Sequence, residues 1–162
     1  MIYKFFKALD EKFGFEQAKA HCDIPCGIYD PIVAQISALT VVRMMDLMAA
    51  LEGEGVAYQN SMSRYVTVKE EHAEQAKNEV RVIWGDFISP AHVEEYPELN
   101  ELVHKIMKLG SKARQTADRE AGVAFVEAIN KFAAIFWAIK GVNTKQAKAP
   151  YAPALEMVYP NL

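Results

Sequence analysis

The chain has 162 residues, of which 51% are hydrophobic and 24% charged, and its formal net charge is −3. This length and composition are typical of one soluble globular domain with its own core. The small negative charge excludes a basic nucleic-acid surface, and no apolar run approaches the roughly 18 to 20 residues that a membrane helix needs. We therefore expect neither nucleic acid nor a membrane as a partner.

The first twenty residues predict a short amphipathic helix. Its apolar residues recur at helical spacing between charged ones, namely Phe5, Phe6, Leu9 and Phe13. Charges interrupt every apolar run here, whereas a secretory signal needs an uncharged stretch of about 7–15 residues, so we expect a cytoplasmic protein. The segment Ala18-Lys19-Ala20 imitates a cleavage site. Two interpretations stay open: a helix that packs on the domain, or a leader whose removal leaves His21 as the N-terminus.

Both cysteines of the chain lie in the sequence HCDIPCGIYDP, which begins at His21. Pro25 fixes its own φ and Gly27 permits a positive φ, so this sequence predicts a tight hook rather than a helix. Such a hook can turn the thiols of Cys22 and Cys26 toward one point beside the histidine. Two thiolates select soft or borderline metals, among them zinc, copper(I), nickel and iron.

These residues alone leave a metal hook and a disulfide or two idle thiols as open alternatives. A structural zinc site usually has four side-chain ligands, and the hook offers three. His72, His92 and His104 could supply a fourth, although backbone nitrogen is nearer. In a chain that begins at His21, the free amine and the amide nitrogen of Cys22 lie within one chelate. Two nitrogens and two sulfurs in a plane suit Ni(II), but the spacing does not by itself select nickel.

Beyond the hook, the apolar pattern predicts the first two of four amphipathic helices. The first starts at Asp30-Pro31, and its apolar residues lie on more than one face, which indicates contact with another subunit as well as a core. The second runs roughly from Ser63 to Phe87. Its polar residues predict a solvent-facing side made of Lys69, Glu70, Glu74, Lys77, Asn78 and Arg81.

The third predicted helix begins at Pro97, and the fourth carries an apolar stripe from Phe125 to Ile139 and ends at Gly141. The remaining tail is rich in proline, and no segment shows the alternation typical of strands. We therefore predict an all-α, up-and-down four-helix bundle with an N-terminal metal-binding hook. Its parts are a leader (1–20), the hook (21–31), the bundle (32–141) and an extended C-terminal tail (142–162).

The hook sequence resembles that of the nickel-type superoxide dismutases, whose pattern is His-Cys-Asp-x-Pro-Cys-Gly-x-Tyr-Asp-Pro. Every fixed position of this pattern matches the chain. The likeness continues in Trp84-Gly85-Asp86-Phe87, in the connector from His92 to Leu99, and in Phe136-Trp137. It spans roughly residues 20–140, and the tail that follows is longer than the family leads us to expect.

This resemblance implies an antioxidant enzyme, a homohexamer, that converts superoxide to oxygen and hydrogen peroxide with one nickel ion per subunit cycling between Ni(II) and Ni(III). A peptidase would remove the leader. His21 would then bind nickel through its amine and, in the oxidised state, its imidazole, Cys22 through its amide nitrogen and thiolate, and Cys26 through its thiolate. Asp23 would stabilise the hook through backbone hydrogen bonds, and Pro25 would shape it.

Tyr29 resembles the tyrosine that limits access to the metal in this family and helps to order water there. The alternative is a tyrosine that only packs on the bundle. Where better-known members place a Glu and an Arg to orient the axial imidazole, this chain has Ser37 and His72, and Phe87 stands in place of a second tyrosine. A non-catalytic nickel-binding protein and a thiol-disulfide redox protein of the same fold are the alternative functions.

Overall fold

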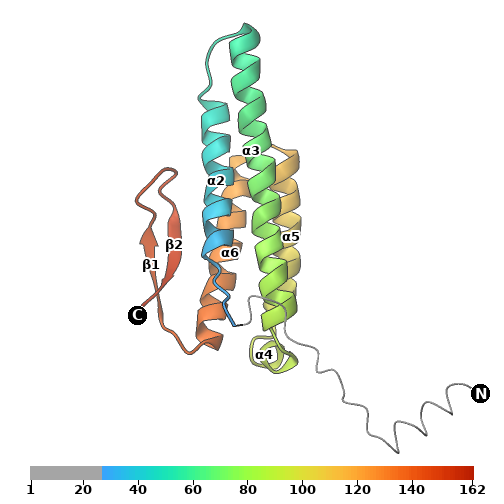
Figure 1. Cartoon of the computed structure of the whole chain (residues 1–162), viewed down its shortest axis with the longest axis vertical. Helices are drawn as coiled ribbons and strands as arrows, with labels where there is room; N and C mark the ends of the chain where they lie inside the picture. Colours follow the sequence, from blue (N-terminus) through green and yellow to red (C-terminus); the bar gives the residue numbers. More distant parts are fainter. Residues whose placement is uncertain (1–26) are drawn as a thin grey trace, which may run out of the picture.

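The structure is a computed structural model that describes residues 27–162. Four long helices run up and down side by side: α2 (Ile32–Ala49), α3 (Gly55–Val82), α5 (Leu99–Gln115) and α6 (Arg119–Ile139) (Figure 1). The π-helix η1 (Ile83–Phe87) continues α3, and the short α4 (Pro90–Glu95) leads into α5. Helices α2 and α5 each pack against both α3 and α6, which closes the ring. The predicted four-helix bundle is confirmed, whereas the leader and most of the hook precede the described residues.

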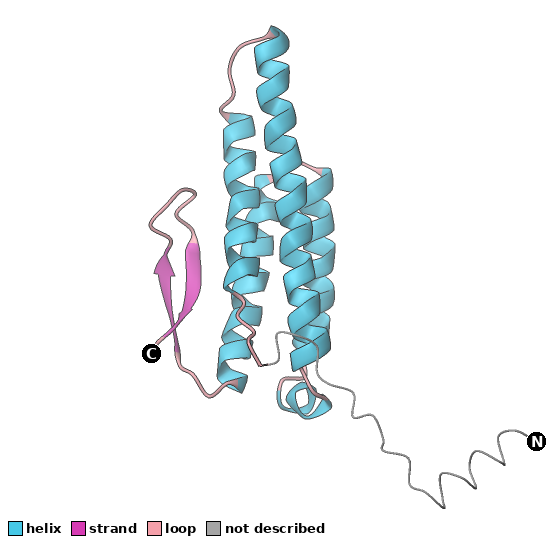
Figure 2. Ribbon diagram, in the orientation of Figure 1, coloured by secondary structure: helices cyan, strands magenta, loops and turns pink. Residues whose placement is uncertain are grey.

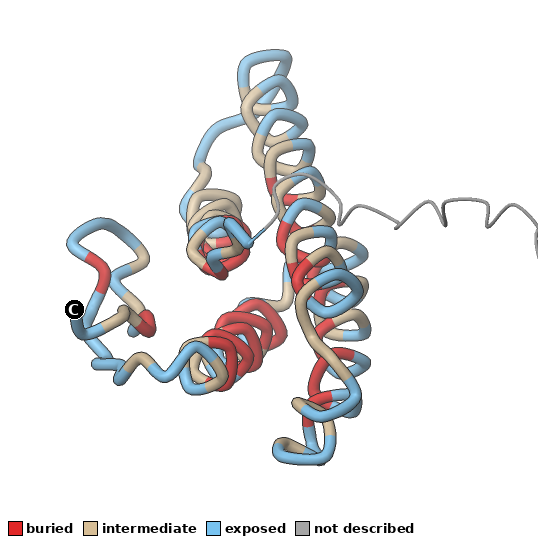
Figure 3. The backbone as a smooth tube through the Cα atoms, turned by 60° about the horizontal axis from the view of Figure 1, so that its bottom comes forward, coloured by how far each residue is buried: buried red, intermediate tan, exposed pale blue. Residues whose placement is uncertain are grey.

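The hydrophobic core lies where the inward stripes of these helices meet, and α6 is buried along most of its length (Figure 3). Its largest fully buried side chains are Phe125, Phe132 and Phe136. Full burial of such a side chain stabilises the fold by about 1.5–3 kcal/mol. Helices α2 and α6 are long and apolar enough to cross a membrane by length and composition, and close to half of each is buried within the bundle.

Local chemistry determines where α2 and α3 begin. The backbone N–H of Ile32 donates to Oδ1 of Asp30 over 2.8 Å, so Asp30 helps to start α2 as predicted. Helix α3 begins at Gly55, well before the predicted Ser63, and rises beyond the end of α2 (Figure 1). Gly53 and Gly55 have φ of +104° and +75°, which favour glycine, so the chain turns sharply and enters the helix at once.

Two lysines that were predicted to lie on the solvent-facing side of α3 are buried, so that part of the prediction was wrong. Lys69 is 2% exposed and Lys77 is 9% exposed, so both lie inside the bundle. The Lys77 stem occupies the space that the missing side chain of Gly110 leaves on α5, because a Cβ there would stand 2.7 Å from Lys77 Cδ. Lysine has a long apolar stem that can lie along buried surface while its ammonium group finds polar partners.

The tail forms a β-hairpin of β1 (Thr144–Lys148) and β2 (Glu156–Pro160), so the expectation of no strands was wrong (Figure 2). Strand β1 is exposed along its whole length. In β2 the neighbouring residues Met157 and Val158 are both buried, so neither strand shows the alternation of a half-buried strand.

Side-chain amides of the bundle fix this hairpin in place. Gln35 of α2 donates to the carbonyl of Val158 over 3.1 Å and to Oδ1 of Asn130 over 2.9 Å. Asn130 of α6 in turn donates to the carbonyl of Glu156 over 2.7 Å. Two carbonyls of β2, those of Glu156 and Val158, thereby accept hydrogen bonds from the bundle, and the hairpin is a packed part of the fold.

Glu74 of α3 pairs with Arg114 of α5, and we expect its contribution to the stability of the fold to be lost in acid. Its carboxylate accepts hydrogen bonds from Arg81 over 2.6 Å, from Arg114 over 2.8 Å and from Lys77 over 3.2 Å. The hydrogen bond from Arg81 is the main cause that lowers the pKa of Glu74 from 4.5 to about 2. Because the folded pKa is depressed, the stabilisation is present above pH 4.5 and is lost as the pH falls toward 2.

We therefore expect Glu74→Gln to lower the free energy of unfolding at pH 7 by about 0.5–1 kcal/mol, since the side chain is 40% exposed and solvent screens its charge. The variant should also lose less stability than the wild type between pH 4.5 and pH 2. Urea denaturation across that range measures both effects. The exposed Glu71→Gln is the matched control, and equal acid curves for the two variants would contradict the assignment.

Candidate metal centre and its attachment to the bundle

The described part of the predicted hook, residues 27–31, packs through Tyr29 against aromatic rings at the end of the bundle where α3 and α6 end. The Tyr29 ring lies 5.8 Å from that of Phe87 in η1, measured between centroids. The Phe87 ring lies 5.1 Å from Phe136 of α6 and 5.6 Å from the imidazole of His92 in α4. We call these four side chains the seat. Tyr29 comes from the segment before α2, and the other three side chains come from η1, α4 and α6, so the seat ties that segment to three parts of the bundle.

Lys140, directly after α6, adds a cation to the seat. Its Nζ lies 4.9 Å from the ring centroid of Phe87 and 5.8 Å from that of Phe136. The same ammonium donates to the carbonyl of Gly27 over 3.5 Å. Gly27 has a φ of +80°, in the left-handed region that favours glycine, as the hook prediction requires. One side chain therefore contacts both the aromatic rings and the backbone next to Cys26.

The turn that carries Phe87 is a π-helix. The backbone N–H of Ile88 donates to the carbonyl of Ile83 over 3.2 Å, a bond that spans five residues. Such single π turns occur often at functional sites, because the extra residue redirects the side chains that follow. Sequence periodicity gives no signal for this turn. Lys140 was not predicted as part of the site, and His92 was named only as a possible fourth metal ligand, not as a neighbour of Phe87.

Ser37 and His72 lie apart from the seat. Ser37 is 2% exposed inside α2. His72 is half-buried on α3, and its Nδ1 lies 2.8 Å from the carbonyl of Val68, so a neutral ring donates there and keeps Nε2 as its acceptor. Eleven residues, or about 16 Å of helix rise, separate His72 from Ile83.

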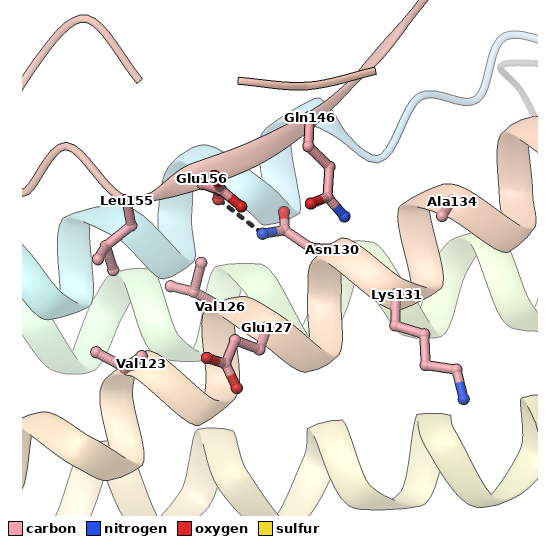
Figure 4. Close-up of a pocket in the computed structure, with 9 residues that line it drawn as sticks. All are labelled: Val123, Val126, Glu127, Asn130, Lys131, Ala134, Gln146, Leu155 and Glu156. Carbon is pink, nitrogen blue, oxygen red and sulfur yellow. Dashed lines mark hydrogen bonds between the residues drawn. The ribbon is translucent and has the colours of Figure 1, made fainter. Parts of the chain in front are cut away.

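A cavity of about 440 Å³ lies elsewhere, between α6 and the hairpin (Figure 4). Apolar Val123, Val126 and Leu155 form part of its wall, and Gln146 and Glu127 add polar groups. None of the predicted site residues lines it. The cavity is therefore lined by none of the four side chains of the seat.

Comparison with known proteins assigns the family. A family model described as nickel-containing superoxide dismutase matches residues 16–140. The chain belongs to the nickel-containing superoxide dismutase family. The match includes the whole hook and ends at Lys140, so the hairpin lies outside it.

Members of the nickel superoxide dismutase family resemble the chain along most of their own length. The superoxide dismutase [Ni] of Streptomyces coelicolor is 38% identical over 121 residues, which cover 75% of this chain and 88% of that protein. The protein of the same name from Streptomyces seoulensis is 38% identical over 124 residues, with coverage of 76% and 91%. A native nickel superoxide dismutase structure superposes with a TM-score of 0.68 at 37% identity, covering 75% of this chain and 99% of the other.

The donor atoms that fit nickel belong to the hook. Within residues 27–162, no three His, Cys, Asp or Glu side chains gather closely enough to hold a metal ion. The predicted ligands His21, Cys22 and Cys26, together with Asp23 and Pro25, precede these residues, so their roles stay predictions. Two thiolates with nitrogen donors are a set that nickel accepts.

Lys140→Met should weaken nickel binding without unfolding the bundle. The substitution removes the hydrogen bond to Gly27 and the charge over Phe87, while it keeps a side chain of similar length. A contact of this kind is worth about 1 kcal/mol, so we expect roughly a fivefold rise in the nickel dissociation constant of the processed chain. Competition with a chelator measures that constant. Lys145→Met, on the exposed strand β1, should leave it unchanged, and an equal rise in both variants would contradict the role of Lys140.

Proposed function

We propose that the chain, once residues 1–20 are removed, dismutates superoxide at a nickel hook. Two superoxide ions and two protons yield one oxygen and one hydrogen peroxide. Membership of the family supports a nickel-dependent superoxide dismutase, and the match includes the hook residues. The proposal adds the donor set: the amine and axial imidazole of His21, the amide nitrogen and thiolate of Cys22, and the thiolate of Cys26. Nickel bound there would supply one-electron chemistry by cycling between Ni(II) and Ni(III).

The hook's own chemistry supports this donor set. Thiolates and a deprotonated amide carry negative charge, and that charge favours the higher oxidation state of a bound ion. A bound metal also lowers the pKa of a cysteine, so both sulfurs would be thiolates at neutral pH. An amine bears no such charge, but it is available only at a chain end. With the leader attached, the nitrogen of His21 is part of a peptide bond, so the precursor should hold nickel poorly.

The observation that carries the proposal is the anchoring of the chain directly after Cys26. Lys140 holds the Gly27 carbonyl, and Phe87 holds the Tyr29 ring. Donors that emerge from a fixed point lose less conformational entropy when they bind a metal than donors on a free chain end. Tyr29, fixed by its ring, would stand beside the hook, where its hydroxyl would limit access and order water for proton delivery.

We further propose a cytoplasmic homohexamer. Three apolar side chains are exposed near the start of α2: Ile28 at 77%, Val33 at 37% and Ile36 at 44%. A second subunit that covered them would remove this apolar surface from water and enclose the hook. Analytical ultracentrifugation of the processed protein should show a hexamer, and a monomer at micromolar concentration would contradict this part of the proposal.

The decisive experiment compares chains that differ only in their N-terminus. The chain that starts at His21 should bind one nickel per subunit and dismutate superoxide, while the full-length chain should do neither. A chain that starts at Ala20 is the matched control, since it keeps every donor side chain and moves the free amine by one residue. Equal nickel content and activity in all three chains would refute the amine ligand. Nickel without activity in the first chain would indicate a nickel-binding protein instead.

A further inference from the structure

We propose that His92 is a positioning residue that makes the seat, and through it the hook, sensitive to pH. The proposal rests on the proposed function only for its link to nickel. His92 touches neither the predicted ligands nor the substrate. It acts through Phe87, the ring on which Tyr29 rests.

Reciprocal hydrogen bonds with Ser89 fix the His92 ring. The Ser89 backbone N–H donates to Nδ1 of His92 over 3.1 Å, and the His92 backbone N–H donates to Oγ of Ser89 over 3.4 Å. Together they form the capping box that starts α4. The residue at the position of His92 in such a box is usually Glu or Gln, whose oxygen accepts a hydrogen bond throughout the neutral pH range. Here the acceptor is an imidazole nitrogen, which loses that ability when it binds a proton.

Protonation therefore reverses the role of Nδ1 in the box. A protonated Nδ1 is a donor that faces the Ser89 N–H, another donor, so the ring has to turn away. Phe87 packs against this imidazole ring, with an angle of 30° between the two ring planes. When the His92 ring turns, the Phe87 ring loses its contact with the imidazole. Tyr29 and Lys140 still contact the Phe87 ring.

Among the described side chains of the seat, His92 is the only imidazole, the type of side chain that can gain or lose a proton between about pH 5 and pH 8. The charged neighbours in the chain are Asp86 in η1, Glu94 and Glu95 on α4 itself, and Lys140 at the end of α6. On the other side of Phe87, the neighbouring ring is that of Tyr29.

The first test measures the capping box in the nickel-free processed protein. We expect the hydrogen-exchange protection factor of the Ser89 amide to fall severalfold between pH 7.5 and pH 5.5, because a protonated Nδ1 no longer accepts the Ser89 hydrogen bond. In His92→Gln, which keeps an acceptor that does not titrate, the protection factor should stay constant. A wild-type protection factor that does not change would overturn the proposal whatever the chain does with nickel.

The second test links the box to the hook through the rate at which bound nickel is lost to a chelator. In the wild type this rate should rise as the pH falls from 7.5 to 5.5. His92→Phe, which keeps a ring but no acceptor, should lose nickel quickly at both pH values, and His92→Gln should have the flatter profile. His104→Gln on the exposed side of α5 is the control and should follow the wild type.

A negative result in one of these two tests leaves the other test informative. Metal binding by thiolate and imidazole donors is itself pH-dependent, so part of the wild-type profile persists in every variant, and only the difference that His92→Gln makes is assigned to His92. A profile of His92→Gln identical to that of the wild type would overturn the link to the hook. Absence of nickel binding in every chain would refute the proposed function, and the exchange of Ser89 would still decide the role of His92 in the seat.

Discussion

Replacing Cys26 by serine in the processed chain should abolish stoichiometric nickel binding and reduce superoxide dismutation to the level of metal-free protein. A serine hydroxyl does not ionise near neutral pH, so the hook loses one of its two soft donors. Loss of a residue that merely supports a metal ligand costs 10–100-fold in affinity, so we expect loss of a ligand to cost more than about 100-fold. Metal analysis and a superoxide-decay assay measure the two effects, and Cys22→Ser should behave alike.

Folding provides the control for these variants. The main core cluster is built from the helices of the bundle together with Ala149 and Met157 of the hairpin region, so Cys26→Ser should keep the helical circular dichroism and the melting temperature of metal-free wild type. A thiol-disulfide protein would also lose function in this variant, and chelation separates the two cases. Wild type stripped of nickel with both thiols intact should be inactive and should recover when nickel returns. Activity that survives complete removal of the metal would exclude the nickel mechanism.

Helical periodicity was enough to predict the bundle because its signal is carried by large side chains. Phe125, Phe132 and Phe136 fall on one face of α6, and that face is buried as expected. Helix ends with a local chemical cause were also predictable, as at Asp30 and at Gly141, whose φ is +71°. The start of α3 was missed because its first turns rise beyond α2 and are mostly exposed, as Val56 is at 83%, so their apolar residues form no buried stripe that periodicity could detect.

The hairpin and the seat could not be predicted because they depend on contacts between distant residues. Nothing near Val158 in the sequence indicates that Gln35 would donate to its carbonyl. Lys140 likewise gives no sign that it would lie over Phe87, far earlier in the chain. The ligand set was suggested by a different kind of signal, since the hook pattern is local and short. Its donors precede the described residues, so that part of the site stays a prediction.

The burial of Lys69 also depends on contacts with distant residues and could not be predicted from the sequence. We expect its replacement to cause a large loss of stability. The ammonium is buried and donates to three carbonyls at the end of α5: Ala113 over 2.7 Å, Thr116 over 2.9 Å, and Arg114. The last carbonyls of a helix have no partner within the helix, so Lys69 caps α5 from the neighbouring helix. Burial lowers the pKa of Lys69, which shows that the charge has a desolvation cost that these bonds must offset.

Lys69→Met should therefore lower the free energy of unfolding by about 3 kcal/mol, because methionine fills the apolar path and leaves carbonyls without a donor. For a chain of this size, the melting temperature should drop by roughly 6–12 °C. Thermal and urea unfolding measure these changes. Lys108→Met, exposed on α5, should stay within about 0.5 kcal/mol of the wild type. If Lys69→Met proved as stable as that control, the desolvation cost would equal the hydrogen bonds, and Lys69 would not stabilise α5.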